Sequence, residues 1–108
     1  MAAARKQAAQ PVKVVDECAV IRCAAGRGLV REEVWEDCSG NVVRYNLAFI
    51  QHELFAGDHG RVLGYDNAHG SSHRHFAGRV EAIAPARYGE ILQRFLGEIE
   101  ELRKRTAL

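Results

Sequence analysis

Hydrophobic and polar residues alternate through most of the chain, and glycines separate the alternating segments. The glycines stand at intervals that suit an antiparallel meander, in which each strand turns back beside the previous one. The pattern predicts strands at Val14 to Cys23, Leu29 to Glu36, Val42 to His52, Arg61 to Asn67, and His73 to Ile83. We therefore expect about five strands in one antiparallel sheet.

After Pro85 the apolar residues recur at spacings of three and four positions. This spacing is typical of an amphipathic helix, whose apolar stripe packs on a core. The stripe consists of Tyr88, Ile91, Leu92, Phe95, Leu96, Ile99 and Leu102. The predicted fold class is therefore α+β: a meander sheet with one face covered by a long C-terminal helix.

Alternation along each strand also assigns side chains to the two faces of the sheet. The face beneath the helix is expected to hold Val43, Tyr45, Leu47, Phe49, Leu63, Tyr65, Phe76 and Val80. The other face is expected to hold Arg44, Asn46, Ile50, His52, Val62, Gly64, Asp66, His73, His75, Arg79 and Glu81. A bulge at Gly64 or Gly78 would insert one residue and reverse the facing of everything beyond it.

The composition fits one small soluble domain. The 108 residues are 47% hydrophobic and 27% charged, and the formal net charge is +1, so no overall field attracts the chain to nucleic acid. No apolar run of about 18 residues is present to cross a bilayer. Residues 1–11 are rich in alanine and lack the apolar segment of a secretory signal. We expect a disordered tail there, before a single cytoplasmic domain at residues 12–108.

The three cysteines, Cys18, Cys23 and Cys38, form an odd set without a CxxC pair. That set suits neither a disulfide framework nor a zinc ribbon. We expect three small buried residues in a reducing compartment. Gly26 and Gly28 lie between two predicted strands, and no phosphate-binding loop pattern occurs, so no organic cofactor is expected.

All five histidines lie between positions 52 and 75. His73 and His75 are expected to share one face of a strand, roughly 7 Å apart because each residue rises ~3.4 Å. Asp66, on the neighbouring strand, provides a carboxylate that can fix a tautomer or accept a proton. The cluster therefore predicts a site for one phosphate or one metal ion.

The segment GYDNAHG, from Gly64 to Gly70, is followed by His73-Arg74-His75-Phe76. Together they resemble the small bacterial TumE-type toxins of toxin–antitoxin pairs, over roughly residues 14–101. The resemblance implies a toxic activity on RNA and a partner antitoxin, usually a helix-turn-helix protein. Ser72 stands where relatives often carry an acidic residue or histidine. The positions that match are Asp66, Asn67, His73, Arg74 and His75.

The residues and the resemblance together favour a metal-independent endoribonuclease. Cleavage beside a 2′-hydroxyl needs a base, an acid, and cations that stabilise the phosphorane charge. His73 and His75 are assigned as base and acid, in either order, and Asp66 as the group that orients one imidazole. Arg74 or Arg79 is expected to bind the phosphate. Further RNA contacts are expected from Arg44, Arg61, Arg79 and Asn67.

Two other interpretations stay open. His73 and His75, with His69 or Asp66, form a donor set for zinc or another divalent ion, and an open coordination position would make such a site hydrolytic. Alternatively, the polar face docks a partner without catalysis, in which case charge reversal at Arg79 abolishes the complex. The apolar stripe of the helix could also extend into a homodimer.

Overall fold

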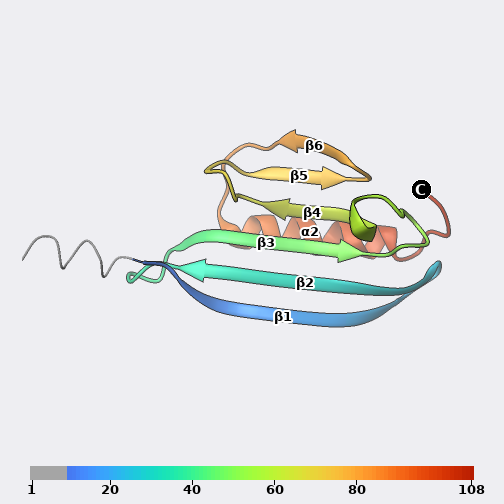
Figure 1. Ribbon diagram of the computed structural model, residues 1–108, viewed down its shortest axis with the longest axis horizontal. Coiled ribbons are helices and arrows are strands. Elements are labelled where there is room, and N and C mark those ends of the chain that lie inside the picture. Colours follow the sequence, from blue (N-terminus) through green and yellow to red (C-terminus); the bar gives the residue numbers. More distant parts are fainter. Residues whose placement is uncertain (1–9) are drawn as a thin grey trace, which may run out of the picture.

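Residues 10–108 are described by the computed structural model, and they form one antiparallel sheet and one α-helix. The strands are β1 (Val12–Cys23), β2 (Gly26–Glu36), β3 (Val42–Ile50), β4 (Arg61–Asp66), β5 (His73–Phe76) and β6 (Arg79–Ala82). Each strand pairs with the next, so the sheet is a meander with β1 and β6 at its edges (Figure 1). The helix α2 (Tyr88–Leu102) lies across one face, and the α+β prediction is confirmed. The tail expected at residues 1–11 lies, apart from its last two residues, outside the described part.

The sheet has six strands rather than five because the expected strand from His73 to Ile83 is a hairpin. Ala77 and Gly78 form its two-residue turn, and both have left-handed backbone, with φ of 48° and 83°. Glycine adopts this conformation without a side-chain clash, so Gly78 favours a turn of this kind. Phe76 pairs with Arg79 directly across the turn.

The hairpin turn reverses the predicted facing of β6. His75 pairs with Val80, so Val80 shares the face of the histidine and is 59% exposed rather than buried in the core. Arg79 and Glu81 pair with Phe76 and Arg74, on the side of the sheet that carries α2. The prediction had placed all three β6 side chains on the opposite faces.

The core lies between α2 and the adjacent strands β3 and β4. The helix buries Ile91, Phe95, Ile99 and Leu102 against Tyr45, Leu47, Phe49, Leu63 and Tyr65. Full burial of each such side chain contributes about 1.5–3 kcal/mol. Most of the predicted core is thus confirmed, but Val43 and Leu96 are 40% and 46% exposed.

A bulge in β4 changes the face of its first two residues. Phe49 pairs with Leu63, whereas Ile50 pairs with Arg61, so Val62 is an extra residue. An extra residue reverses the alternation on its far side. Val62 is therefore fully buried in the core, where the prediction had placed it on the other face. Arg61 comes to the face without the helix.

We call the side of the sheet without α2 the helix-free face. The strand registers place on it, among others, Lys13, Asp16, Cys18, Arg31, Glu33, Trp35, Arg44, Asn46, Arg61, Asp66, His73 and His75. β3 ends at Ile50, so His52 belongs to the following loop instead of this face. The prediction that Arg44, Asn46, Asp66, His73 and His75 lie on the helix-free face is therefore confirmed.

The cysteines differ from the expectation. Cys18 and Cys38 are exposed and Cys23 is half-buried, and all three thiols are free. Cys18 is exposed because it lies on the helix-free face of an edge strand. In the described part of the chain, no helix is both long and apolar enough to span a bilayer.

Candidate active site

His75 and Asp66 form a hydrogen-bonded pair on the helix-free face. β4 and β5 are in register so that Asp66 lies opposite His73, and Gly64 lies opposite His75. The two imidazoles and the carboxylate therefore share one face. Nε2 of His75 lies 2.8 Å from Oδ2 of Asp66. The two side chains are only 16% and 17% exposed, so solvent screens their interaction weakly.

Arg61 occupies the other ring nitrogen of His75. Its Nη2 lies 3.1 Å from Nδ1. Because a guanidinium group can only donate, Nδ1 accepts, and Nε2 carries the proton that is donated to Asp66. Arg61 also donates from Nε to Oδ2 of Asp58 over 2.8 Å, and its Nη1 lies 3.9 Å from Asp66. The four side chains thus form one continuous polar network.

A strained turn positions Asp58. The short 3-10 helix η1 (Asp58–Gly60) has left-handed backbone at Asp58 and His59, with φ of 50° and 55°. Such a backbone is unfavourable for residues with a side chain and persists where other contacts hold it. The ion pair to Arg61 is one such contact, and the backbone hydrogen bond from Gln51 to Gly60 over 2.9 Å is another. Sequence reasoning missed this part of the site, because the GDHG run indicates only a turn.

A shallow hollow of about 340 Å³ adjoins the network. Ala48 and Ile50 contribute its apolar part, and its polar lining consists of Arg31, Glu33, Asn46, Asp58, His59 and Arg61. This volume is at the lower end of the range for small-molecule sites. Arg61 lines the hollow and also contacts His75, so a group bound in the hollow would meet the same guanidinium that holds the imidazole.

Toward β1 and β2 the helix-free face carries a tryptophan flanked by cations. Cζ of Arg44 and Nζ of Lys13 lie 4.7 Å and 5.0 Å from the centre of the Trp35 ring. Hydrogen bonds from Lys13 and then Asn46 lower the pKa of Glu33 below its usual value. Arg44 forms no ion pair with any described residue, so its charge is available to an anionic ligand.

Arg74, expected to act with the histidines, lies on the other face. It pairs with Tyr65 in the register of β4 and β5, and both side chains point toward α2. Its Nε donates to Oε2 of Glu98 over 3.0 Å, and its Nη1 donates to Glu81 over 3.3 Å. The Tyr65 hydroxyl donates to Glu98 as well. Arg74 therefore links β5 to the helix and cannot reach a phosphate beside His75.

The structure also separates Arg79, Asn67 and His69 from the network. Arg79 lies on the helix side of β6, as described above. The Asn67 amide accepts from the backbone N of Tyr45 over 2.9 Å and donates to the carbonyl of Val43 over 3.1 Å. This side chain therefore extends the ladder between β3 and β4. His69 is exposed in the turn between β4 and β5.

The metal-binding interpretation finds no matching donor set in residues 10–108. No three His, Cys, Asp or Glu side chains in that part of the chain are grouped closely enough to hold an ion. The hydrogen bonds of His75 bear more directly on metal binding. Both its ring nitrogens are engaged, and the guanidinium of Arg61 at Nδ1 would repel a cation. The arrangement suits an anion better.

No family model, curated protein or solved structure matches this chain. Function must therefore be inferred from the chemistry of the helix-free face itself.

Proposed function

We propose that the protein is the toxin of a toxin–antitoxin pair and acts in the cytoplasm as a metal-independent endoribonuclease. The arrangement of His73, His75, Asp66 and Arg61 on one face supports this proposal most strongly. It combines two imidazoles, a carboxylate that orients one of them, and a cation beside a hollow. These are the groups that cleavage of RNA next to a 2′-hydroxyl requires.

The reaction needs two proton transfers. One imidazole takes the proton of the 2′-hydroxyl as its oxygen attacks phosphorus, and the other gives a proton to the departing 5′-oxygen. The products are a 2′,3′-cyclic phosphate and a free 5′-hydroxyl. His73 and His75 fill these roles, in an order that we leave open. Their separation, roughly 7 Å along the strand, suits groups on either side of one phosphate.

Arg61 prepares His75 for its role. In the free protein its guanidinium occupies Nδ1 of the imidazole, so that nitrogen is not available for proton transfer. A phosphodiester in the adjoining hollow competes for the same guanidinium. When Arg61 turns to the phosphate, Nδ1 becomes free while Nε2 stays bound to Asp66. Substrate binding then activates the base or acid, and Arg61 stabilises the phosphorane charge.

Other residues contribute to RNA binding. Arg44 forms no ion pair with any described carboxylate and lies two residues along β3 from Asn46 at the edge of the hollow, where it can neutralise a flanking phosphate. The face as a whole carries both signs of charge, so binding depends on these local cations and not on a general attraction. A helix-turn-helix antitoxin that neutralises the toxin would cover the same face.

The test is regulated expression of the intact chain in a bacterial host, with growth and RNA integrity followed together, and cleavage of RNA by the purified protein. His75→Ala and His73→Ala should each lower cleavage by at least about 100-fold, which is the lower range of general acid–base catalysis. Asp66→Asn should lower it less, since it keeps a hydrogen-bonding group. His69→Ala is the matched control, because it removes an exposed imidazole from a neighbouring turn.

The products and the control distinguish the alternatives. Ends with 2′,3′-cyclic phosphate, formed in the presence of a chelator, support side-chain catalysis. Loss of activity in His69→Ala, together with a requirement for metal, would instead indicate a divalent-metal hydrolase. Growth arrest with intact RNA would indicate a non-catalytic protein that binds a partner, and full activity of His75→Ala would overturn the proposed site.

A further inference from the structure

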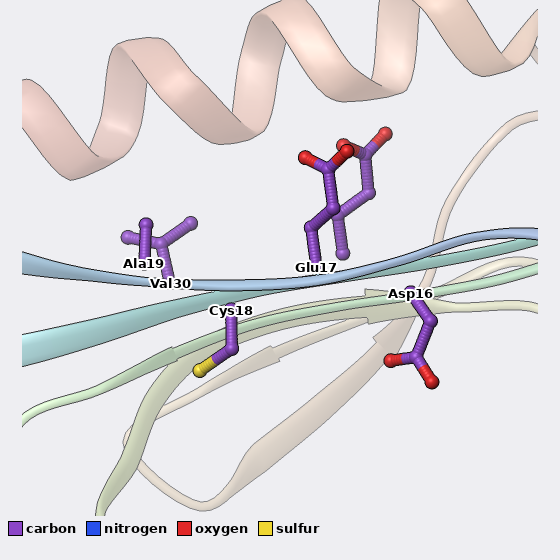
Figure 2. A pocket seen from close by; sticks show the side chains of 6 residues that line it. Asp16, Glu17, Cys18, Ala19 and Val30 are labelled. Atoms are coloured by element: carbon purple, nitrogen blue, oxygen red, sulfur yellow. The ribbon is translucent and has the colours of Figure 1, made fainter.

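β1 is an uncovered edge of the sheet. It is 12 residues long, and within the described chain no strand lies beyond it. The helix covers β3 and β4 instead (Figure 1). Figure 2 shows Glu17, Ala19 and Val30 pointing toward the side of α2, and Asp16 and Cys18 pointing to the helix-free face. These residues line an open hollow of about 520 Å³.

The outer backbone groups of β1 are available in its central part. β1 and β2 are joined by a two-residue turn, closed by the pair Cys23 and Gly26. A turn of this kind begins with a hydrogen-bonded pair, and bonded positions alternate from there. The N–H and C=O groups of Asp16, Cys18 and Val20 are therefore directed away from β2. A strand of another chain can pair with them.

Both ends of this edge are protected, and the middle is not. At one end a register shift between Lys13 and Val15 interrupts the ladder. At the other end the guanidinium of Arg103 donates to the carbonyl of Arg22 over 2.9 and 3.1 Å. Bulges, charges and covering groups are the usual means by which proteins block an edge strand. Neither a bulge nor a covering group lies between Asp16 and Val20, so this segment can receive a partner strand whose charges complement its own.

β2 complements the charges of β1 only in part. Arg22 lies opposite Arg27, Glu17 opposite Glu32, and Asp16 opposite Glu33. Like charges directly opposite one another on adjacent strands are destabilising. Lys13 and Arg31 offset only the last of these pairs, since each cation contacts both Asp16 and Glu33. Arg22 and Asp16 both remain exposed, and they are of opposite sign and six residues apart on the same strand.

We propose that two copies of this chain pair through their β1 strands, antiparallel about a two-fold axis at Ala19. In this register the backbone groups of Cys18 pair with those of Val20 of the other copy. The side chains of Arg22 and Asp16 lie opposite each other at each end of the interface, where Arg103 already holds the Arg22 carbonyl. Among the possible axes near the centre of β1, the axis at Ala19 is the one that places Arg22 opposite Asp16 at both ends of the interface. A second copy supplies the complementary sequence on both sides of the axis, as an isologous interface requires.

Pairing about this axis forms a continuous 12-stranded sheet. Because the axis is perpendicular to the sheet, both helices lie on one side and both helix-free faces on the other. The two His75–Asp66 sites then open to the same surface, roughly 40 Å apart at about 4.8 Å per strand. The dimer therefore presents one extended polar surface to a ligand. The proposal stands on β1 alone and does not depend on the reaction.

The test uses the full chain and two charge reversals in sedimentation equilibrium. Arg22→Asp places two aspartates opposite each other at each end of the interface, and Asp16→Arg places two arginines there. Each variant alone should dimerise at least about tenfold more weakly than the natural chain. An equimolar mixture of the two variants restores both opposite-charge pairs, so it should recover the dimer as a heterodimer. Arg22→Asp also relieves the repulsion with Arg27, so its fold should be intact.

The matched control is Arg79→Asp, which reverses an exposed arginine on the opposite edge strand and should leave the dimer unchanged. Circular dichroism verifies that each variant is folded. A natural chain that is monomeric throughout the concentration series would overturn the proposal. A mixture that stays monomeric would overturn the charge pairing, and loss of the dimer in Arg79→Asp would assign it to the other edge.

A disulfide gives a measurement that does not depend on charge. Val20→Cys should form covalent dimers under mild oxidation, because residue 20 lies opposite Cys18 of the partner. Within one chain, Cα atoms two residues apart on a strand are too far apart for an unstrained bridge. Cross-linking of the natural chain through Cys18 alone would indicate an axis at Cys18 and overturn the register proposed.

Discussion

Gly64 lies directly beneath the side chain of Arg61: a Cβ at position 64 would come 2.9 Å from Cδ of Arg61. The absence of a side chain at Gly64 therefore leaves the space through which the Arg61 side chain extends to His75. Its backbone is not in the left-handed region, so the lack of a side chain matters here for space and not for conformation.

Gly64→Ala should therefore displace Arg61 while the fold is kept. The new methyl group also approaches the carbonyl oxygen of Leu47, at 3.1 Å, so we expect a loss of about 1 kcal/mol in the free energy of unfolding. RNA cleavage should fall by roughly tenfold or more, because a small displacement of a positioned group is costly. Unfolding by denaturant and RNA cleavage measure the two effects. Gly97→Ala, at an exposed helix position with open space, should leave cleavage unchanged.

Arg74→Met tests the separation of the two faces. The change removes the ion pair with Glu98 but keeps an unbranched apolar stem. Since the side chains of Arg74 and Glu98 are only 19% and 27% exposed, we expect unfolding to become easier by about 1–3 kcal/mol. RNA cleavage should change little at a temperature where the variant is folded. A 100-fold loss of cleavage in the folded variant would place Arg74 in the catalytic machinery after all.

The sequence predicted that His73, His75 and Asp66 share one face of the sheet, because this depends only on the two-residue alternation of side chains along a strand. Asp66 lies on the helix-free face because Tyr65 and Leu63 face the core. His73 and His75 lie two residues apart on β5, so both side chains are on the same face as Asp66. No bulge interrupts the ladder between β4 and β5. Local alternation was therefore sufficient to bring the imidazoles to the carboxylate.

The sequence named Arg61 and Arg79 as RNA contacts but could not reveal that Arg61 reaches His75 and that Arg79 lies on the other face. Arg61 changes face because Val62 is an extra residue, and a bulge depends on the partner strand as well as on its own sequence. Arg79 was misplaced because HFAGRV also fits one continuous strand, in which Ala77 and Gly78 would be ordinary positions. The exposure of Cys18 follows from the edge position of β1, which alternation does not encode.

Ionisation of Tyr65 should lower the free energy of unfolding at alkaline pH. Burial, together with its hydrogen bond to the Glu98 carboxylate, raises the pKa of Tyr65 to about 12. An unfolded tyrosine has a pKa of about 10, so the folded state holds this proton more tightly. Its contribution is complete below pH 10 and is lost as the pH rises from about 10 to 12, by up to about 2 kcal/mol.

Tyr65→Phe is the variant that checks this limit. It should lower the free energy of unfolding by about 1–2 kcal/mol at neutral pH, and stability should then decline less steeply between pH 10 and 12. Some decline should remain, because the pKa values of Tyr88 and Tyr45 are also raised, mainly by burial. Parallel stability curves for the two proteins across this range would show that the Tyr65 hydroxyl does not titrate as described.

Gln51 should be needed for the loop that carries Asp58. Its side chain is fully buried, and its Oε1 accepts from the backbone N of Glu53 and of Leu54, over 2.7 and 3.2 Å. Its Nε2 donates to the carbonyl of Arg27 over 3.3 Å. The amide thus satisfies three backbone groups where the chain leaves β3, and Asp58 follows in the same loop.

Gln51→Leu keeps a similar volume but removes this partner from the N–H of Glu53 and the carbonyl of Arg27, whereas Leu54 N can still donate to the Gln51 carbonyl. An unsatisfied buried polar group costs about 1–3 kcal/mol, so we expect a loss of at least that size in the free energy of unfolding. The control is Gln93→Leu on the exposed side of α2, which should change stability by no more than about 0.5 kcal/mol. Denaturant unfolding measures both variants, and hydrogen exchange of the loop after β3 should quicken only in Gln51→Leu. Equal stability of the two variants would mean that water replaces the amide at little cost.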